Sequence, residues 1–394
     1  MSIQLNIFAI VLLFAFVQGV IYTILFIKRG IQEERQSDFW MAAAIAALCI
    51  SNLASMLGFM GIYLLGQQYW FAPYSTSLVI GPIFYYYLKT QINSDFQFSK
   101  RDFKHFIPYC LYFIYHAVIF LMGKNIEDWW VQTVHNPLHM NDLTNFAEMI
   151  SLCGYMILAV RLYRKYLRWL PKERSDTEGV RFEWYRHFLW AVVVGVVAAL
   201  ITFIAGFWMQ LSYWDDWVQR AILAAIIYYI SIAGFIQNQP RHLVFLEKND
   251  TQSLNSPLEM VEFKGVEAIK SENKMDNMDL EKWQFKIERV MQNEKLYLNP
   301  ELTLSELSDK LESHNSLISN VINTQFQKNF NDFVNEFRVN VFKEKIKDPK
   351  LQHLTLLAIA FDCGFNSKST FNRAVKKVTG EMPSAFLMSK GDSL

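Results

Sequence analysis

The chain has 394 residues, enough for two or three domains, and a formal net charge of +1. Hydrophobic residues make up 52% of it and charged residues only 19%, against roughly 25% charged residues in an average soluble domain. Almost all of the apolar excess lies before residue 240, and the charged residues concentrate after it. This composition excludes a single water-soluble globule and predicts an apolar half followed by a charged half.

The four cysteines show no paired spacing, which argues against a disulfide framework or a zinc knuckle. Three lie in apolar stretches and the fourth lies in a helical, charged region: Cys49, Cys110, Cys153 and Cys363. We interpret all four as structural thiols.

Seven stretches before residue 240 reach the roughly 20 predominantly apolar residues that a membrane-spanning helix needs. The first is no secretion signal, because no basic residue precedes it and Lys28 and Arg29 follow it. In the third, Pro73 and the Gly81 and Pro82 pair predict a kink, since neighbouring groups in a bundle re-satisfy the freed backbone. The stretches cover residues 5–27, 39–65, 69–88, 104–122, 143–160, 188–209 and 217–236.

Basic residues alternate between the two sides of these stretches, as expected when positive charge stays in the cytoplasm. With the N-terminus outside, the outer loops carry one basic residue, Lys124. The pattern predicts an integral membrane protein surrounded by lipid, with everything after Ile236 in the cytoplasm. The inner loops carry Lys28, Arg29, Arg35, Lys89, Lys100, Arg101, Lys104, Arg161, Arg164, Lys165, Arg168, Lys172, Arg174, Arg181 and Arg186.

Polar residues inside the apolar stretches are few, and an unpaired charge there is costly. Glu148 and Arg220 both lie near the outer face, and we hypothesise that they face each other across a small pocket open to the outside. Together with His116 they form a candidate sensor pocket. The alternative is that both charged side chains reach the membrane interface and form no site.

His135 and His139 in an outer loop, with Asp142 nearby, are residue types that bind metals. Pro137, however, breaks the helix that would bring the two histidines onto one face. The sequence therefore predicts no metal site and no cofactor. The spans contain no nucleophile–base pair and no phosphate-binding glycine loop, so we also predict that the chain is not an enzyme.

Residues 241–277 are polar, contain Pro257 and show no periodicity, which is typical of a flexible tether. An amphipathic pattern begins at Met278 and ends near Asn299 and Pro300, a pair that stops helices. The apolar stripe of this predicted helix comprises Trp283, Ile287, Val290 and Met291.

Two short helices joined by a tight turn are predicted next, which is the arrangement of a helix-turn-helix unit. Thr303 and Glu306 have the spacing of a capping box at the start of the first helix. Leu304, Leu307 and Leu311 then recur at helical spacing. The second helix carries Leu317, Ile318, Val321 and Ile322.

The same pattern returns about fifty residues later, and a repeated helix pair is a stronger signal than either pair alone. The turn of the second pair contains Gly364, which can take the left-handed conformation that ends a helix. Residues 330–347 predict one connecting helix between the pairs. The corresponding positions are Leu356, Ile359 and Ala360 for Leu304, Leu307 and Ser308, and Phe371, Arg373 and Val375 for Ile318, Asn320 and Ile322.

The run from Thr355 to Pro383, TLLAIAFDCGFNSKSTFNRAVKKVTGEMP, resembles the signature of AraC/XylS-type transcription regulators. Residues 303–330 and 333–347 are similar to the first half and the linker helix of that domain. The resemblance covers roughly residues 278–387 and implies two helix-turn-helix subdomains that read adjacent major grooves of double-stranded DNA. Membrane-embedded regulators of this type exist, and the whole chain resembles them.

The two units differ in charge. Residues 296–339 carry three basic residues against six acidic ones, whereas residues 340–390 carry nine basic residues against four acidic ones. The first recognition helix has Asn320 where the family often has a basic residue. Because attraction to phosphates dominates affinity for DNA, we expect the second unit to hold the DNA and the first to contribute polar contacts or little.

We predict DNA contacts on the polar faces of both recognition helices; the alternative is that these faces are merely solvated. In the second helix, Lys368, Ser369, Asn372 and Arg373 are expected in the groove, with Lys376 and Lys377 on phosphates. In the first helix, the polar face comprises Ser316, Ser319, Asn320 and Asn323.

The sequence thus predicts an all-α protein with a seven-span domain over residues 1–240, a linker over 241–277 and a DNA-binding domain over 278–394. We interpret it as a one-component transcription regulator of a bacterial inner membrane, with a small-molecule or envelope signal sensed by the bundle and pairing as a homodimer. The alternatives are a transporter or membrane enzyme with a regulatory tail, and a scaffold whose helix-turn-helix does not bind DNA.

Overall fold

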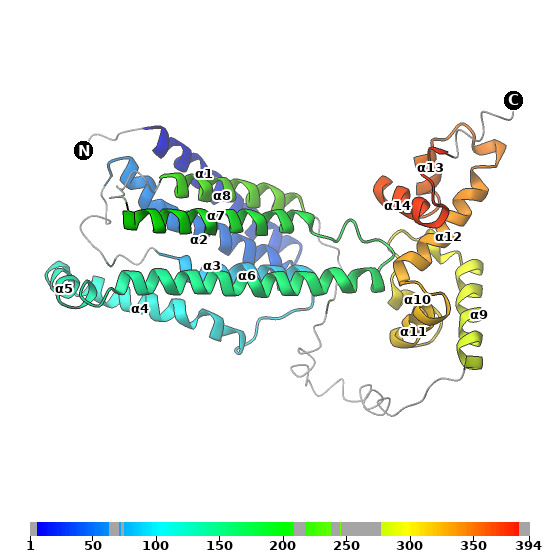
Figure 1. Ribbon diagram of the computed structural model, residues 1–394, viewed down its shortest axis with the longest axis horizontal. Helices are drawn as coiled ribbons and strands as arrows, with labels where there is room; N and C mark the ends of the chain where they lie inside the picture. The colour runs from blue at the N-terminus through cyan, green and yellow to red at the C-terminus, as the bar shows by residue number, and fades with distance from the viewer. Residues whose placement is uncertain are drawn as a thin grey trace. The chain divides into compact units, whose positions relative to one another are not determined.

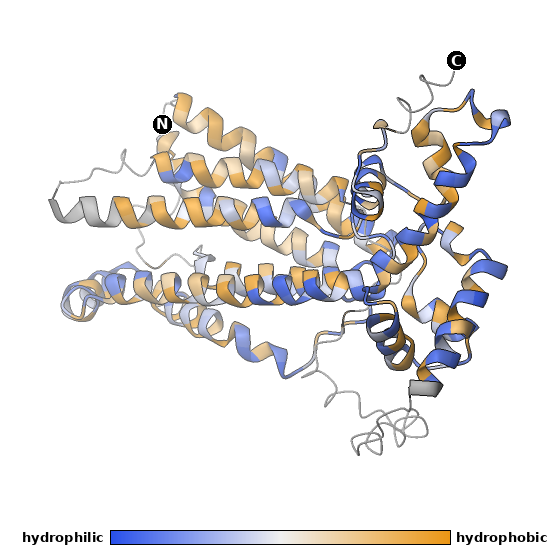
Figure 2. Ribbon diagram, turned by 45° about the vertical axis from the view of Figure 1, so that its right-hand side comes forward, coloured by the Kyte–Doolittle hydropathy of each residue, from blue (hydrophilic) through white to orange (hydrophobic). Residues whose placement is uncertain are grey.

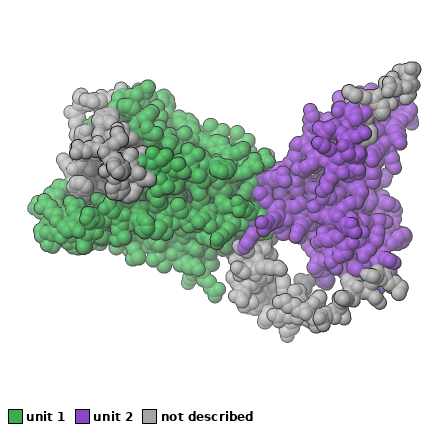
Figure 3. Space-filling view, viewed as in Figure 1, with its two compact units in different colours: residues 1–164, 182–245 green, residues 165–181, 246–394 purple. Residues whose placement is uncertain are grey.

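In the computed structural model, all regular elements of the described residues are helices (Figure 1). The structure describes residues 6–62, 71, 75–208, 217–237, 245 and 277–385. The chain divides into two compact units, shown in Figure 3. Unit 1 comprises Met1–Arg164 and Phe182–Phe245, and unit 2 comprises Lys165–Arg181 and Leu246–Leu394. The all-α prediction is confirmed for the described residues, whereas the predicted linker over residues 241–277 lies almost entirely outside them.

Unit 1 is built from long helices that pack side by side. Helix α1 packs against α2 and α8, α2 against α3, and α7 against α8. Figure 2 shows hydrophobic residues running along most of their length. The bounds are α1 Ile7–Gln32, α2 Gln36–Phe59, α3 Ser77–Ile92, α4 Ile107–Leu121, α5 Lys124–Trp130, α6 Met140–Glu173, α7 Glu183–Trp208 and α8 Trp217–Ile236.

Apolar side chains of unit 1 face both inward and outward. Ala9, Leu12 and Ala15 of α1 are buried against Met56 and Phe59 of α2. Other apolar side chains remain largely exposed, such as Phe14 at 63% and Leu121 at 81%. Because water does not tolerate so large an apolar surface on a stable monomer, this outer surface fits a lipid environment.

Among the described residues, five helical segments are long and apolar enough to cross a membrane. They are Ile7–Gln32, Gln36–Phe59, Asp102–Leu121, Met140–Glu173 and Trp217–Ile236. The predicted count of seven is therefore not confirmed. The third predicted span becomes α3, which begins only at Ser77, has 16 residues and continues through Pro82 without ending there. The sixth becomes α7. Pro73 lies outside the described residues.

Helix α6 is much longer than the apolar stretch that predicts it. It has 34 residues and runs through the basic positions Arg161 to Arg168 and past Pro171 to Glu173. Hydropathy detects only the apolar part of a helix, whereas arginine, lysine and leucine are good helix formers whatever their polarity. The basic residues expected in an inner loop are thus partly helical, and those from Lys165 onward belong to unit 2.

Unit 2 contains two helix pairs that share one long helix. Ile287 and Met291 of the first helix, α9, are buried together with apolar side chains of α10, α11 and the start of α12. Val339, Phe342 and residues of α13 and α14 form a second hydrophobic cluster. The bounds are α9 Asn277–Asn293, α10 Leu304–Lys310, α11 Asn315–Gln325, α12 Phe330–Lys345, α13 Leu356–Phe361 and α14 Lys368–Thr379.

Local capping explains where these short helices begin. The Thr303 side chain accepts a hydrogen bond from the Glu306 amide at 3.2 Å, and the Glu306 carboxylate accepts one from the Thr303 amide at 3.0 Å. This is the predicted capping box. Thr355 and Ser367 cap α13 and α14 in the same way, each accepting from an amide three residues later at 3.1 Å. Each cap satisfies a backbone donor that the helix itself leaves unpaired.

The turn between α13 and α14 requires a glycine for two reasons. Gly364 has a φ of +91°, the left-handed conformation predicted for it. A Cβ at this position would also lie 2.3 Å from the backbone oxygen of Tyr297. The second helix pair is thus packed closely against the 3₁₀ turn that precedes the first pair.

Replacing Gly364 by alanine is expected to lower the free energy of unfolding of unit 2 by at least about 2 kcal/mol, because backbone strain and a backbone clash add together. Gly380→Ala is a matched control, since Gly380 also has a positive φ of +82° but a Cβ there meets nothing within 4 Å. Urea titration of the full chain in detergent, read by hydrogen exchange in α13 and α14, measures both. Equal losses in the two variants would contradict the close packing.

Candidate nucleic-acid interface

Helix α14 presents a basic face and is held by a row of buried residues. Thr370, Phe371, Ala374 and Val375 are buried. The Phe371 ring lies 4.8 Å from that of Phe342 and 5.4 Å from that of Phe365. This packing fixes which side of the helix faces away from the core. On that side Lys368, Ser369, Arg373, Lys376 and Lys377 are exposed, and Asn372 is half-buried.

Helix α11 presents a polar face without positive charge. Ile318, Val321 and Ile322 point into the core. The face opposite them carries hydroxyl and amide groups only, because the helix sequence NSLISNVINTQ contains no charged residue. Asn323 donates to the Ser319 hydroxyl at 3.4 Å. Ser316, Asn320 and Asn323 are exposed and Ser319 is half-buried.

The shared helix α12 is anchored by a buried arginine. Arg338 is only 1% exposed. Its guanidinium donates to the backbone oxygens of Tyr297 at 2.8 Å and Asn299 at 2.7 Å, and to the Asn335 side chain at 3.1 Å. Burial lowers the pKa of Arg338 to about 10, against the opposing effect of the Asp176 carboxylate. The group therefore remains charged at neutral pH and joins the start of the first helix pair to the helix that supports the second.

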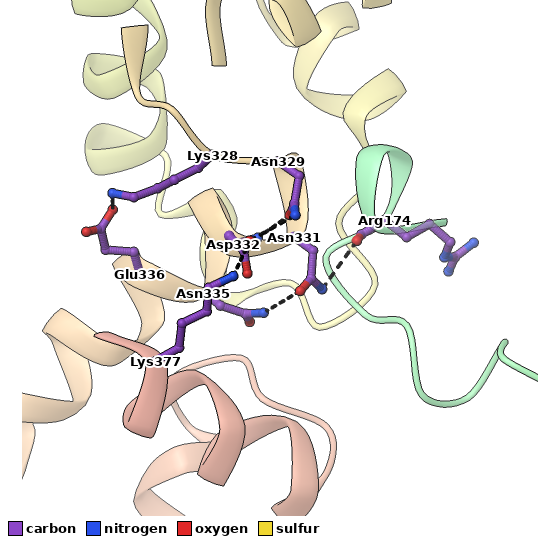
Figure 4. A network of polar contacts seen from close by, with 8 residues as sticks. All are labelled: Arg174, Lys328, Asn329, Asn331, Asp332, Asn335, Glu336 and Lys377. Atoms are coloured by element: carbon purple, nitrogen blue, oxygen red, sulfur yellow. Dashed lines mark hydrogen bonds and ion pairs between the residues drawn. The ribbon is translucent and has the colours of Figure 1, made fainter. Parts of the chain in front are cut away.

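A network of polar contacts lies along α12, as Figure 4 shows. Lys377 of α14 forms an ion pair with Asp332 of α12 at 2.6 Å, and Lys328 pairs with Glu336. Asn335 donates to the Asn331 side-chain oxygen at 3.2 Å. Lys377, predicted on a phosphate, is thus engaged with a carboxylate in this structure.

Sequence reasoning missed one further part of this surface, the segment of residues 174–181. It follows α6 and belongs to unit 2. Ser175 is fully buried; its amide donates to the Leu302 oxygen at 3.0 Å and its own backbone oxygen accepts from Asn331 at 2.6 Å. Arg338 donates to the Ser175 hydroxyl at 3.0 Å. The hint in the sequence was that Asp176 and Glu178 stand between the basic residues Arg174 and Arg181.

Glu178 of this segment lies at the N-terminus of α14. Its carboxylate accepts hydrogen bonds from the hydroxyls of Ser367 and Ser369. Burial alone would raise the pKa of Glu178, but these hydroxyls and the positive charge of Arg373 hold it below its usual value. The carboxylate therefore stays ionised at neutral pH, at the end of the helix whose dipole favours an anion.

A cavity of about 410 Å³ lies within unit 2 next to these contacts. The end of α6 contributes Leu170 and Pro171, and the 174–181 segment contributes Thr177 and Arg181. The opposite walls come from α12 and α14. They include Asn331, Asp332, Asn335, Arg373 and Lys377.

The candidate sensor residues lie in unit 1, and only two of the three come together. The Glu148 carboxylate accepts from the Ser75 hydroxyl at 3.4 Å and interacts electrostatically with Arg220. His116 instead packs between aromatic rings, with its ring centre 4.1 Å from Tyr112 and 4.9 Å from Phe71. No described contact joins it to the other two.

The two histidines considered for a metal site, His135 and His139, lie in different surroundings. His135 is buried and its Nε2 lies 2.9 Å from the Asn141 side-chain oxygen. His139 is exposed and pairs with Asp142 at 3.2 Å. Among the described residues, no cluster of three or more histidine, cysteine, aspartate or glutamate side chains has the geometry to hold a metal ion.

Comparison with known proteins yields one match. A family of helix-turn-helix domains matches residues 307–389, which contain both recognition helices and the shared helix α12. No curated protein and no solved structure matches the chain. The matched residues overlap the stretch, roughly 278–387, that resembles the AraC/XylS type. The C-terminal part of this chain therefore carries a helix-turn-helix domain over residues 307–389.

Proposed function

We propose that the chain is a membrane-embedded transcription regulator that binds double-stranded DNA through its two helix-turn-helix units. The observation that carries this proposal is the exposed basic face of α14, on a helix whose start is capped and whose opposite side is buried. A rigid helix with such a face fits the major groove of DNA. The family match over residues 307–389 supports the DNA-binding part of this proposal.

The two recognition helices are proposed to have unequal roles. On α14, Lys368, Asn372 and Arg373 reach base edges, while Lys376 contacts phosphates. Lys377 contacts a phosphate after exchanging its Asp332 partner. The α11 face has no charge to attract the backbone, so its serine and asparagine side chains contribute polar base contacts and little affinity.

The apolar helices of unit 1 are proposed to hold the protein in a bacterial inner membrane. Three observations support this placement: five helical segments of the described residues are long and apolar enough to span, the outer surface is apolar, and basic residues alternate between the loops. We propose seven spans, with the N-terminus outside and the helix-turn-helix domain in the cytoplasm. The Glu148 and Arg220 pair is the proposed point where a small-molecule or envelope signal acts on the bundle.

The test is selection of DNA by the full chain, reconstituted in lipid nanodiscs, from a pool of random duplexes. We expect recovery of a defined sequence, and an affinity that falls steeply with salt, by a slope of about 0.9 per neutralised phosphate on logarithmic axes. Recovery of no sequence above the random pool, together with a flat salt dependence, would reject DNA binding and favour the scaffold alternative.

A further inference from the structure

The 174–181 segment lies on the DNA-binding unit, although the sequence places it in an inner loop between α6 and α7. Its first residues are held by backbone pairing, because Arg174 forms an antiparallel bridge with Thr303. Ser175 adds hydrogen bonds to Leu302, Asn331 and Arg338. These anchors come from the start of α10 and from α12, so the segment is seated on both the first helix pair and the shared helix.

The later residues of the segment form a turn that positions Glu178. The Glu178 amide donates to the Asp176 side chain at 3.1 Å. The Val180 backbone oxygen accepts a hydrogen bond from the Tyr166 hydroxyl. The first contact is internal to the segment, and the second ties the segment to helix α6. The glutamate is therefore presented by a loop of defined shape and does not reach α14 as an isolated long side chain.

The partners of the Glu178 carboxylate are those that a DNA phosphate would use. Two hydroxyls, from Ser367 and Ser369, donate to one carboxylate oxygen, and Arg373 supplies a nearby positive charge. A helix N-terminus binds a carboxylate or a phosphate through the same donors and the same dipole. Ser369 and Arg373 are also two of the residues expected in the groove. The Ser369 hydroxyl cannot donate to Glu178 and to DNA at once, and Arg373 would face two competing negative charges.

We propose that the 174–181 segment is an intramolecular competitor of DNA, with Glu178 occupying the DNA-binding start of α14 until the segment is withdrawn. This inference rests on the proposed function and concerns the regulation of the same surface. The segment is continuous with α6 and α7, two of the proposed spanning helices. A change in the membrane bundle that shifts these helices would pull on both ends of the segment and thereby free α14.

The decisive variant is Glu178→Gln, which keeps the size of the side chain and removes its charge. We expect the full-length variant in nanodiscs to bind a duplex selected from the random pool about tenfold more tightly than the wild type, the effect of losing charge-assisted contacts that compete with DNA. Glu183→Gln is the matched control, because Glu183 is an exposed glutamate at the start of α7. It should leave DNA affinity unchanged.

Hydrogen exchange provides a second measurement that does not depend on affinity. In the wild type without DNA, the Ser175 amide should exchange slowly, and saturating selected duplex should accelerate exchange across residues 174–181. A random duplex at the same concentration should have less effect.

The outcomes separate the two proposals. If Glu178→Gln and wild type bind the selected duplex equally and exchange in the segment does not respond to DNA, the competitor is rejected while DNA binding stands. If neither chain retains any duplex above the random pool, DNA binding itself is rejected and the competitor is rejected with it. Tighter binding by the glutamine variant alone, with the Glu183→Gln control unchanged, supports both.

Discussion

Replacing Arg338 by alanine is expected to lower the free energy of unfolding of unit 2 by about 3–5 kcal/mol, the loss typical of removing one member of a buried charged network. The variant leaves the Tyr297 backbone oxygen and the Asn335 side chain without their donor in a buried place, and it also removes the part-buried hydrogen bond to the Asn299 oxygen. An acceptor deprived of its partner loses its hydrogen bond without regaining water. Helix α12 would lose the hydrogen bonds of Arg338 to the 3₁₀ turn that precedes the first helix pair.

Two further variants make this expectation specific. Arg338→Lys should recover little, because a single ammonium cannot supply the fork of donors that reaches several acceptors at once. Arg289→Ala is the surface control, since Arg289 is exposed on α9. Urea titration of the full chain in detergent, read by hydrogen exchange in α12, measures all three. Equal stability of the Arg338→Ala and Arg289→Ala variants would contradict the structural role assigned to Arg338.

Replacing Arg373 by alanine is expected to weaken DNA binding by about 10- to 100-fold, the range for one arginine that contacts a base. This measurement is made in the Glu178→Gln background, in which a neutral amide replaces the competing carboxylate. Asn320→Ala on α11 should weaken binding by less than about threefold, because an exposed neutral side chain contributes at most a modest hydrogen bond. Fluorescence anisotropy with the selected duplex at several salt concentrations gives both values.

The comparison of these two variants tests the unequal roles of the recognition helices. If Asn320→Ala costs as much as Arg373→Ala, the first helix pair grips DNA as strongly as the second and the charge argument is wrong. If the DNA affinity of the Arg373→Ala variant also falls less steeply with salt concentration than that of the parent, the arginine contacts phosphates as well as bases. The outcome assigns Arg373 to one or both kinds of contact.

Local structural features can be predicted from the sequence because the residues that interact in them are close together in the chain. Thr303 and Glu306 of the capping box are three positions apart, and the structure contains both of its hydrogen bonds. The positive φ of Gly364 follows from the need to reverse the chain within one turn. The buried row of α14, including Phe371 and Val375, follows from a helical period that the sequence displays directly.

Hydropathy predicts the helix bounds of unit 1 less well, because it measures how apolar a stretch is and not where a helix begins or ends. It predicts the last span, Trp217–Ile236, at the bounds that the structure has. It misses the extension of α6 to Glu173, where the helix continues in charged residues. It also starts the third span at residue 69, whereas α3 begins at Ser77.

Counting charges along the sequence treats every ionisable side chain as equally available to bind DNA. Only the tertiary structure decides which of these side chains are exposed and unpaired. Arg338 was counted among the basic residues of the first helix-turn-helix unit. It is nevertheless buried and donates hydrogen bonds to backbone oxygens. Lys377 counted toward phosphate binding, yet it pairs with Asp332, 45 residues away in the chain. Burial and pairing are properties of position in space, so no count along the chain reveals them.

The sequence by itself determined the helical character, the apolar and charged halves, and the paired helices with their caps and exposed faces. These follow from periodicity and from contacts within a few residues. The tertiary structure alone decided that residues 174–181 belong with the helix-turn-helix unit and that Glu178 reaches Ser367, 189 residues further along the chain. Such a contact depends on polar side chains in a segment without periodicity, and nothing local in the sequence predicts which distant donors they meet.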